Sequence, residues 1–203
     1  MIAIIDYQMG NLRSVQKAFE HVGCNAKLTN QLSDLKNASR IVLPGVGGFP
    51  AAMAEIQRQE LAEPIRNLIR SGKPFLGICL GLQLLFDTSY ESHTCDGLGI
   101  FSGEVRQFEA SDNIKVPHMG WNQIDIHHDS PLLHDIPPKS FMYFVHSYYV
   151  QPKDSGIVAL TSNHGHDFCA AIAHENVFAT QFHPEKSQTA GLQIIKNFSQ
   201  WDA

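Results

Sequence analysis

The amino-acid sequence predicts a three-layer α/β fold, with helices on both sides of a mostly parallel central sheet and extra antiparallel strands in the second half. Two observations lead to this prediction. In the first half, short β-rich runs alternate with stretches of helical periodicity, as expected when crossover helices connect parallel strands. From residue 100 onward, strand-like runs follow one another, which favours antiparallel pairing.

The first elements are a strand and an amphipathic helix. Residues 2–5 are apolar throughout, as in a buried parallel strand. Asn11 can cap the helix that follows, and Gly23 is placed to end it. The apolar residues of this helix recur on one face: Leu12, Val15, Phe19 and Val22. A weaker strand is expected over residues 26–29.

The next part of the chain leads to the central strand. Residues 40–43 form a predicted strand that the Pro44-Gly45 pair is expected to stop. Residues 51–70 have a helical pattern that Pro64 is expected to break. Residues 75–78 are apolar and form the predicted central buried strand.

The second half is rich in predicted strands, which cover residues 100–105, 123–126, 141–145, 157–160, 169–173 and 177–181. The chain closes with a helix over residues 191–201, whose stripe of Leu192, Ile195 and Phe198 is expected to pack on the core. No repeat or Pro/Gly/Ser-rich linker interrupts the 203 residues, so we expect one domain spanning residues 1–203.

Composition and charge exclude several classes of function. A formal net charge of −5 argues against nucleic-acid binding, which normally requires a basic excess. No stretch is long and apolar enough to span a membrane, and the apolar N-terminal run is too short for a signal sequence. The four cysteines lie far apart without a CxxC pair, which favours free thiols in a reducing cytoplasm over a zinc or disulfide framework. We therefore expect a cytoplasmic protein without metal or cofactor.

The most informative residue is Cys79, which lies where an apolar strand ends and a helical pattern begins. The run Gly77-Ile78-Cys79-Leu80-Gly81 is typical of a nucleophile elbow, in which a tight strand-to-helix turn presents the nucleophile. The start of the following helix would favour the thiolate, which is the form that attacks carbonyl carbon. Free cysteines more often simply pack in a core, so a catalytic reading of Cys79 requires partners.

The segment His183-Pro184-Glu185 supplies such partners. It follows a predicted strand, and if strand geometry continues, residues two apart project to the same face. Glu185 would then hold one imidazole nitrogen of His183 while the other nitrogen faces Cys79. Taken separately, His183 could be a surface histidine and Glu185 a solvated charge. Together with the elbow they predict a catalytic Cys-His-Glu triad.

Other residues suit the binding side of such a site. The oxyanion formed from a carbonyl needs two N–H donors, which Leu80 and the turn at Val46-Gly47 could supply, although a plain tight turn explains the latter equally well. Gln83 lies one helical turn after Cys79 on the same face and could orient a substrate. The strand end His146-Ser147-Tyr148 could hold the amino-acid moiety of a substrate, or could be an ordinary half-buried strand.

The Gly-x-Cys-x-Gly elbow with its downstream His-x-Glu resembles the class I glutamine amidotransferases. Further blocks occur in the family's order and extend the resemblance over nearly the whole chain: Asp6-Tyr7-Gln8-Met9-Gly10-Asn11, Pro44-Gly45-Val46-Gly47, Pro117-His118-Met119-Gly120-Trp121-Asn122, Phe144-Val145-His146-Ser147-Tyr148 and Phe182-His183-Pro184-Glu185-Lys186-Ser187. Gln8 stands where the family often has glycine. The resemblance implies a flavodoxin-like, class I glutamine amidotransferase-like fold.

The resemblance also implies a chemistry and a partner. Cys79 would attack the side-chain amide carbon of glutamine, ammonia would leave, and the remaining thioester would be hydrolysed to glutamate. Members similar at residues 117–122 pass the ammonia to a (β/α)8-barrel cyclase subunit in a heterodimer that serves amino-acid biosynthesis. Five residues match family positions at or near that interface: Asn11, Met119, Trp121, Asn122 and Lys186. Core packing of Trp121 and a solvated Lys186 are the alternatives.

Three other functions remain compatible with the sequence. A paralogous glutaminase could feed a barrel synthase in surface-polysaccharide sugar biosynthesis. A silent binding module on the same fold could use Cys79 only for packing or oxidant sensing, although the intact His183 and Glu185 argue against it. A stand-alone cysteine hydrolase acting on peptides or amides is disfavoured by Gln83 and by the hexapeptide at residues 117–122.

Overall fold

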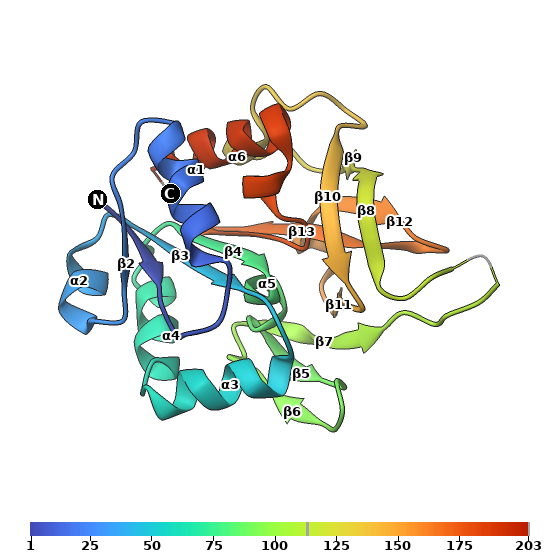
Figure 1. Cartoon of the computed structure of the whole chain (residues 1–203), viewed down its shortest axis with the longest axis horizontal. Coiled ribbons are helices and arrows are strands. Elements are labelled where there is room, and N and C mark those ends of the chain that lie inside the picture. The colour runs from blue at the N-terminus through green and yellow to red at the C-terminus, as the bar shows by residue number, and fades with distance from the viewer. Residues whose placement is uncertain (113, 203) are drawn as a thin grey trace.

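The computed structural model describes residues 1–112 and 114–202, which form a central eight-stranded sheet with helices on both faces (Figure 1). The strand order is β2-β1-β3-β4-β14-β13-β12-β9. The parallel strands are β1 (Ile2–Ile5), β2 (Ala26–Thr29), β3 (Arg40–Gly45), β4 (Phe75–Cys79) and β14 (Val177–Thr180). The antiparallel strands are β13 (Asp167–His174), β12 (Val158–Asn163) and β9 (Asp125–Ile126). The predicted α/β class, with antiparallel strands in the second half, is confirmed.

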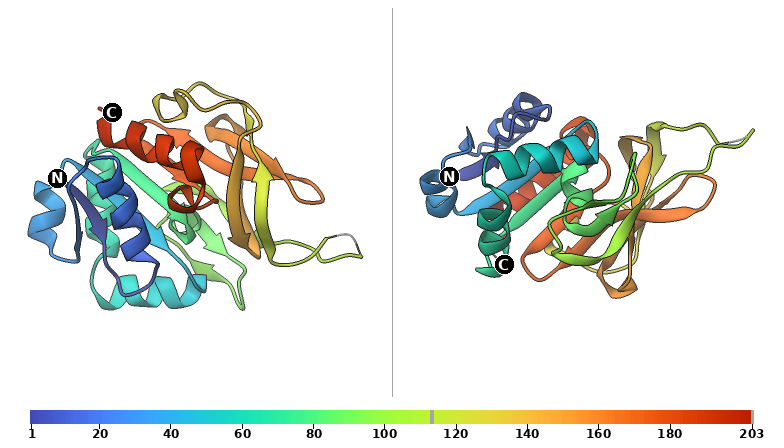
Figure 2. Two further views of the ribbon diagram at one scale, coloured as in Figure 1. Left: turned by 45° about the horizontal axis from the view of Figure 1, so that its top comes forward. Right: turned by 90° about the horizontal axis from the view of Figure 1, so that it is seen from below.

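Helices cover the two faces of this sheet and bury two apolar cores (Figure 2). One face is covered by α1 (Leu12–His21) and α6 (Gln188–Gln200), and the other by α2 (Leu32–Asn37), α3 (Phe49–Arg58) and α4 (Ala62–Arg70). The helix α1 follows Asn11 as predicted, although the Asn11 side chain makes no capping hydrogen bond. No helix in the described part of the chain is long and apolar enough to cross a membrane.

Two smaller sheets complete the fold. Strands β5 (Phe86–Ser89), β6 (Cys95–Asp96), β7 (Phe101–Gln107) and β11 (Tyr148–Pro152) form one, and β8 (His118–Gln123) pairs with β10 (Phe141–His146) in the other. The short helical elements are α5 (Leu80–Gln83), η1 (Pro131–Leu133), η2 (Ser155–Ile157) and η3 (Pro184–Lys186). Figure 1 shows β8 and β10 standing across the far end of the central sheet.

Two predicted breaks in the first half are wrong. The strand β3 continues through Pro44 and Gly45, because β4 still pairs with both residues after the ladder to β1 has ended at Val42. The helical stretch breaks at Glu60, which has a φ of 56°, and not at Pro64. Pro64 lies in the first turn of α4, where a missing backbone N–H costs no helical hydrogen bond.

Several other boundaries differ from the prediction. The run expected at residues 123–126 is two strands separated at Ile124, and β8 begins earlier, at His118. The elements α2, β5, β6 and β11 were not predicted, because each is short and carries polar residues that blur its periodicity. At the N-terminus, Gln8 has a φ of 67°, the left-handed conformation that glycine adopts most readily.

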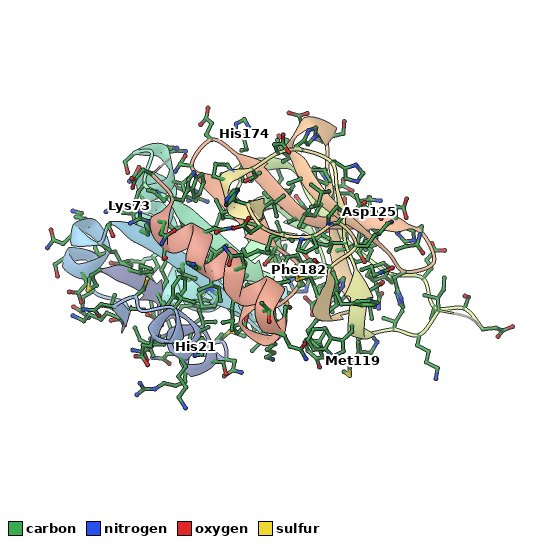
Figure 3. The ribbon with its side chains drawn as sticks, turned by 90° about the horizontal axis from the view of Figure 1, so that it is seen from above. His21, Lys73, Met119, Asp125, His174 and Phe182 are labelled. Atoms are coloured by element: carbon green, nitrogen blue, oxygen red, sulfur yellow. The ribbon has the colours of Figure 1, made fainter. Side chains whose placement is uncertain are left out.

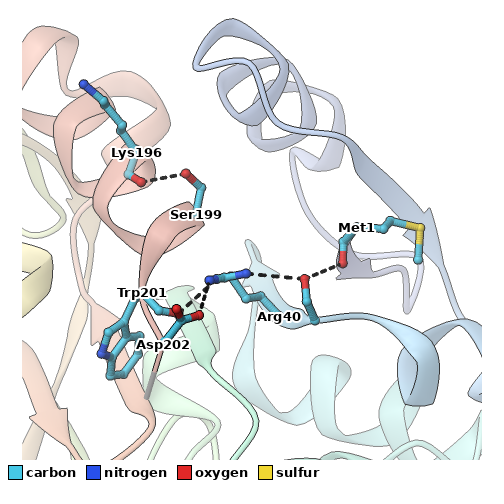
Figure 4. A network of polar contacts seen from close by, with 7 residues as sticks. Met1, Arg40, Lys196, Ser199, Trp201 and Asp202 are labelled. Atoms are coloured by element: carbon cyan, nitrogen blue, oxygen red, sulfur yellow. Dashed lines mark hydrogen bonds and ion pairs between the residues drawn. The ribbon is translucent and has the colours of Figure 1, made fainter.

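The two ends of the chain are tied together beside β3 (Figure 4). Arg40 Nε donates to the Trp201 carbonyl at 3.1 Å, and Arg40 Nη2 pairs with Asp202 Oδ1 at 2.9 Å. Ser39 Oγ donates to the Met1 carbonyl at 3.1 Å. These bonds anchor the C-terminal end of α6, the helix that follows the His183–Glu185 segment.

Candidate active site

Cys79 lies at a sharp turn between β4 and α5. Its φ of 56° and ψ of −108° are rare for a residue with a side chain, and such backbone strain is concentrated at functional sites. The flanking glycines make the turn sterically feasible. A Cβ on Gly81 would lie 1.9 Å from the Leu43 carbonyl oxygen, and one on Gly77 would lie 2.9 Å from Ala179 Cβ. The chain therefore has the geometry of a nucleophile elbow.

His183 and Glu185 form a buried pair. Their Nδ1 and Oε1 atoms lie 2.8 Å apart, and the two side chains are 2% and 1% exposed. From the sequence, continued strand geometry was expected to bring the two side chains together. That geometry is wrong, because β14 ends at Thr180 and η3 turns the chain at Pro184. The two side chains meet across this 3₁₀ turn, which His183 precedes as its N-cap residue.

The other ring nitrogen of His183 is available to the thiol. Nε2 is buried and makes no hydrogen bond to another side chain or backbone group of the described residues. Burial alone would lower the pKa of His183, but its interactions with Cys79 and with Glu185 outweigh burial and raise the pKa from 6.5 to about 10. The raised pKa keeps His183 protonated beside Cys79, where a nucleophile needs an adjacent acid–base group.

Sequence reasoning missed Gln181. This side chain is fully buried, and its Nε2 donates to Cys79 Sγ at 3.7 Å. Its Oε1 accepts from Gln83 Nε2 at 3.1 Å, so that Gln83 reaches the thiol through Gln181. The only sequence signal was a polar residue directly after an apolar strand, which is a weak indication of function.

A cavity of about 290 Å³ opens beside the thiol and gathers most of the predicted site residues. Its lining includes Cys79, His183, Leu80, Val46, Gly47, Gln83, His146, Ser147 and Tyr148. Glu185 lies behind His183 and does not line it. The cavity is of the size expected for a small-molecule site.

Glu91 is a second residue that the sequence did not reveal. It brings a carboxylate to the wall of this cavity, and its Oε2 accepts from the Phe49 N–H at the start of α3 at 2.7 Å. Its negative charge also contributes, after burial, to a raised pKa of Tyr148. Glu91 lies in a loop without any motif, and only the fold brings it to the site.

The predicted oxyanion turn lies beside the elbow. Gly45 is paired with Cys79 across β3 and β4, which places Val46 and Gly47 at the same end of the sheet as the thiol. Gly47 has a φ of 95°, so this turn needs glycine there. Leu80 is the first residue of α5, where a backbone N–H has no partner within the helix.

The residues predicted for a partner interface are divided between surface and interior. Met119 and Trp121 are 63% and 46% exposed on one face of β8, and Figure 3 shows Met119 at the outer edge and Phe182, next to His183, well inside. Lys186 Nζ lies 5.8 Å from the centre of the Tyr143 ring. Asn11 is exposed, whereas the Asn122 amide is bonded internally to His118 and to the Asn163 carbonyl.

Within residues 1–112 and 114–202, no three or more His, Cys, Asp or Glu side chains are grouped as a metal site would require.

Comparison with known proteins gives a consistent picture. The family described as Glutamine amidotransferase class-I matches residues 3–201. The chain is 52% identical over 199 residues to the protein named imidazole glycerol phosphate synthase subunit HisH of Rhodopirellula baltica, with 98% of this chain and 97% of the relative covered. It is also 52% identical over 203 residues to the protein of the same name from Syntrophotalea carbinolica, with 98% of each covered.

Solved structures agree in fold. A glutamine amidotransferase superposes with a TM-score of 0.75 at 15% identity, covering 98% of this chain and 99% of that one. PurLQS from Thermotoga maritima superposes with a TM-score of 0.73 at 22% identity, covering 98% and 95%. At these identities the structural likeness concerns the fold alone.

Proposed function

The chain belongs to the class I glutamine amidotransferase family, and from that premise we propose that it is the glutaminase subunit of an imidazole glycerol phosphate synthase, with Cys79, His183 and Glu185 as its catalytic triad. The observation that carries the proposal is the buried His183–Glu185 pair, which leaves His183 Nε2 free beside a thiol on a strained elbow. The whole chain, residues 1–203, serves as one glutamine amidotransferase domain.

In the first half-reaction the Cys79 thiolate attacks the side-chain amide carbon of glutamine, and the carbonyl oxygen becomes an oxyanion. His183 then gives its proton to the amide nitrogen, the C–N bond breaks, and ammonia leaves a thioester on Cys79. The raised pKa of His183 suits this step, because the imidazolium persists until the leaving group needs its proton.

In the second half-reaction the now neutral His183 removes a proton from water, and the resulting hydroxide attacks the thioester. The C–S bond breaks, glutamate leaves, and Cys79 returns as thiolate beside the reprotonated His183. Glu185 keeps the proton of His183 Nδ1 in place throughout, so that Nε2 performs both transfers. We assign stabilisation of the oxyanion in both steps to the N–H groups of Leu80 and of Val46 or Gly47.

The walls of the cavity suit glutamine. Gln83 and the strip His146-Ser147-Tyr148 line it and present amide, hydroxyl and backbone groups. Glu91 supplies a carboxylate, which we assign to the α-ammonium group of the substrate. This assignment explains why a charged side chain faces a small cavity whose other lining residues are neutral, apart from the catalytic pair.

Relatives about half identical to this chain are named as a subunit of imidazole glycerol phosphate synthase, so the protein works in a complex. We propose that the partner is the (β/α)8-barrel cyclase subunit, which forms imidazole glycerol phosphate and the purine precursor AICAR in histidine biosynthesis. Ammonia is mostly ammonium in neutral water and then cannot act as a nucleophile, which gives a reason to pass it directly to the partner. Surface-polysaccharide biosynthesis is not favoured by the relatives' names.

We place the partner interface on the exposed face that contains Met119 and Trp121, together with Lys186, which like Trp121 contacts the Tyr143 ring. The exposed Asn11 is assigned to the interface on the family resemblance alone. Exposed apolar side chains of this size are typical of a docking surface. Asn122 lies on the same strand, but its amide is bonded within the subunit. We place the complex in the cytoplasm, where a catalytic thiol stays reduced.

The experiment that tests the proposed function is a glutaminase assay of the chain alone, with the cyclase subunit, and with the cyclase and its nucleotide ligand. We expect glutamate formation to rise strongly when both partner and nucleotide are present. A rate of glutamine hydrolysis that does not change when the cyclase and its nucleotide are added would contradict the assigned pathway. The absence of any glutamine hydrolysis under all three conditions would contradict the assigned chemistry.

A further inference from the structure

We propose that His118 and His146 are neutral positioning residues that both carry their proton on Nδ1. They form a hydrogen-bonded relay that runs in one direction, from Asn122 to the Tyr148 carbonyl. The relay holds the substrate strip His146-Ser147-Tyr148 of the candidate active site in place. The two histidines are direct neighbours across β8 and β10 and are each 6% exposed. His146 lines the cavity, whereas His118 lies behind it.

The inner end of the relay fixes the positions of its protons. His146 Nδ1 lies 2.8 Å from the Tyr148 carbonyl oxygen, which can only accept, so Nδ1 must donate. In a neutral ring Nε2 is then an acceptor. It lies 3.0 Å from His118 Nδ1, which must therefore carry the proton of the second histidine.

The outer end agrees with this assignment. His118 Nε2 is left as an acceptor, and it lies 3.1 Å from Asn122 Nδ2. The orientation of the Asn122 amide is fixed independently, because its Nδ2 donates to the Asn163 carbonyl at 2.7 Å and its Oδ1 accepts from the Gln123 N–H at 2.8 Å. Each hydrogen bond of the relay thus has one donor and one acceptor, and each donor points from Asn122 toward the Tyr148 carbonyl.

A proton added to either ring would place two N–H groups against each other. Burial opposes an added proton as well, since both rings are 6% exposed and His118 is enclosed by the stacked rings of Phe144 and His164 at centroid distances of 4.9 and 4.2 Å. Burial, followed by the positive charge of His164, lowers the pKa of His118 to about 4. Burial, partly offset by the Tyr148 carbonyl and reinforced by His118, His164 and His183, lowers the pKa of His146 to about 3.

The relay ends on a group that the candidate site uses. The Tyr148 carbonyl also accepts from Gln83 Nε2 at 3.0 Å, and Gln83 contacts Gln181, whose amide donates to Cys79 Sγ. Without the relay, the Tyr148 carbonyl would no longer be held in position by His146. The Gln83 amide, which donates to the same carbonyl at the cavity wall, would then lose a fixed partner. The expected effect on function rests on the proposed glutaminase activity, whereas the assignment of the protons is independent of that activity.

The proton positions are tested by long-range ¹H–¹⁵N correlation spectra of the protein with ¹⁵N-labelled histidine rings, assigned with His118→Phe and His146→Asn. We expect two rings in the Nδ1–H form, which is the less common one for free imidazole, unchanged between pH 6 and 8. A ring of this pair in the Nε2–H form, or one that titrates in this range, would overturn the relay whatever the activity of the enzyme.

The positioning role is tested by glutaminase kinetics of the complex. His118→Phe keeps a ring for stacking but removes both hydrogen bonds, and we expect KM for glutamine to rise about tenfold with kcat changed less, as befits one buried polar group left unpaired. His118→Asn, which can still donate toward His146, should recover part of this loss. His164→Phe is the matched control, because His164 stacks on His118 without joining the relay and bonds instead to the Lys115 carbonyl.

An unchanged KM in His118→Phe, or an equal rise in His164→Phe, would refute the positioning role. Labelling of Cys79 by a glutamine-analogue electrophile in the same variants separates this outcome from a failure of the proposed function. If the wild-type protein is not labelled and does not hydrolyse glutamine, the glutaminase assignment is wrong, and the spectra alone then decide whether the relay exists.

Discussion

The imidazole of His183 and the carboxylate of Glu185 are hydrogen bonded at 2.8 Å across a 3₁₀ turn, and both are almost completely buried. The hydrogen bond fixes the imidazole ring, and Cys79 and Glu185 together raise the pKa of His183. We expect Glu185→Gln to lower kcat by about 10²- to 10⁴-fold, because the amide no longer stabilises the imidazolium. Steady-state kinetics of the complex measure this, and a loss smaller than tenfold would show that Glu185 is dispensable.

The same pair should make stability depend on pH. The pKa of His183 in the folded protein, about 10, lies above its ordinary value of 6.5, so the folded state binds this proton more tightly. The resulting stabilisation is complete below about pH 6.5 and is lost as the pH rises through about 10. In thermal unfolding from pH 6 to 10, the stability difference between wild type and Glu185→Gln should shrink with rising pH. A difference that is constant over this range would contradict the raised pKa.

The elbow should not tolerate a side chain at Gly81. A Cβ there would lie 1.9 Å from the Leu43 carbonyl oxygen, so Gly81→Ala must displace β3 or α5. We expect a loss of about 1–3 kcal/mol in the free energy of unfolding and a large loss of glutaminase activity. In Gly72→Ala the added methyl group meets open space at a φ of 79°, so activity should survive. Equal activity in the two variants would argue against a sterically constrained elbow.

Glu91 is expected to serve substrate binding more than chemistry. Glu91→Gln removes the charge but keeps an oxygen that can accept from the Phe49 N–H, so the fold should be retained. Loss of a charged hydrogen bond to the substrate's ammonium group should raise KM for glutamine about tenfold or more, with a smaller effect on kcat. An unaltered KM, measured in the complex, would remove Glu91 from the binding site.

Much of the fold could be predicted from the sequence, because the parallel strands are short apolar runs that alternate with amphipathic helices. The helix α1 and the strands β1, β2 and β4 illustrate this. The failures at Pro44 and Pro64 arose from context that a local pattern does not contain. A proline is tolerated where the ladder to one neighbour has ended or in the first turn of a helix.

The site was predictable only where chemistry depends on sequence-adjacent residues. The glycines around Cys79 and the spacing of His183 and Glu185 are local, and the fold brings both segments together. Glu91, Gln181 and His118 were not assigned roles, because their importance comes from neighbours distant in sequence. The contact between Gln181 and Cys79, for example, spans 102 positions.

Lys186 should matter for the partner and not for the triad. It follows Glu185 but lies over the Tyr143 ring, which also contacts Trp121. We expect Lys186→Ala to weaken cyclase association, or the stimulation that the cyclase confers, about tenfold, which is the effect of truncating an energetically important interface residue. Lys196→Ala, an exposed lysine on α6, is the control. Unchanged affinity and unchanged stimulation in Lys186→Ala would remove it from the proposed interface.

The central claim is that Cys79 generates ammonia which the partner consumes. Its most direct test is Cys79→Ala in the complex with the cyclase, assayed for imidazole glycerol phosphate synthesis with glutamine and, separately, with ammonium salts. We expect synthesis from glutamine to disappear and synthesis from ammonium to continue at the wild-type rate. Retained synthesis from glutamine, or equal loss with both nitrogen sources, would contradict the account.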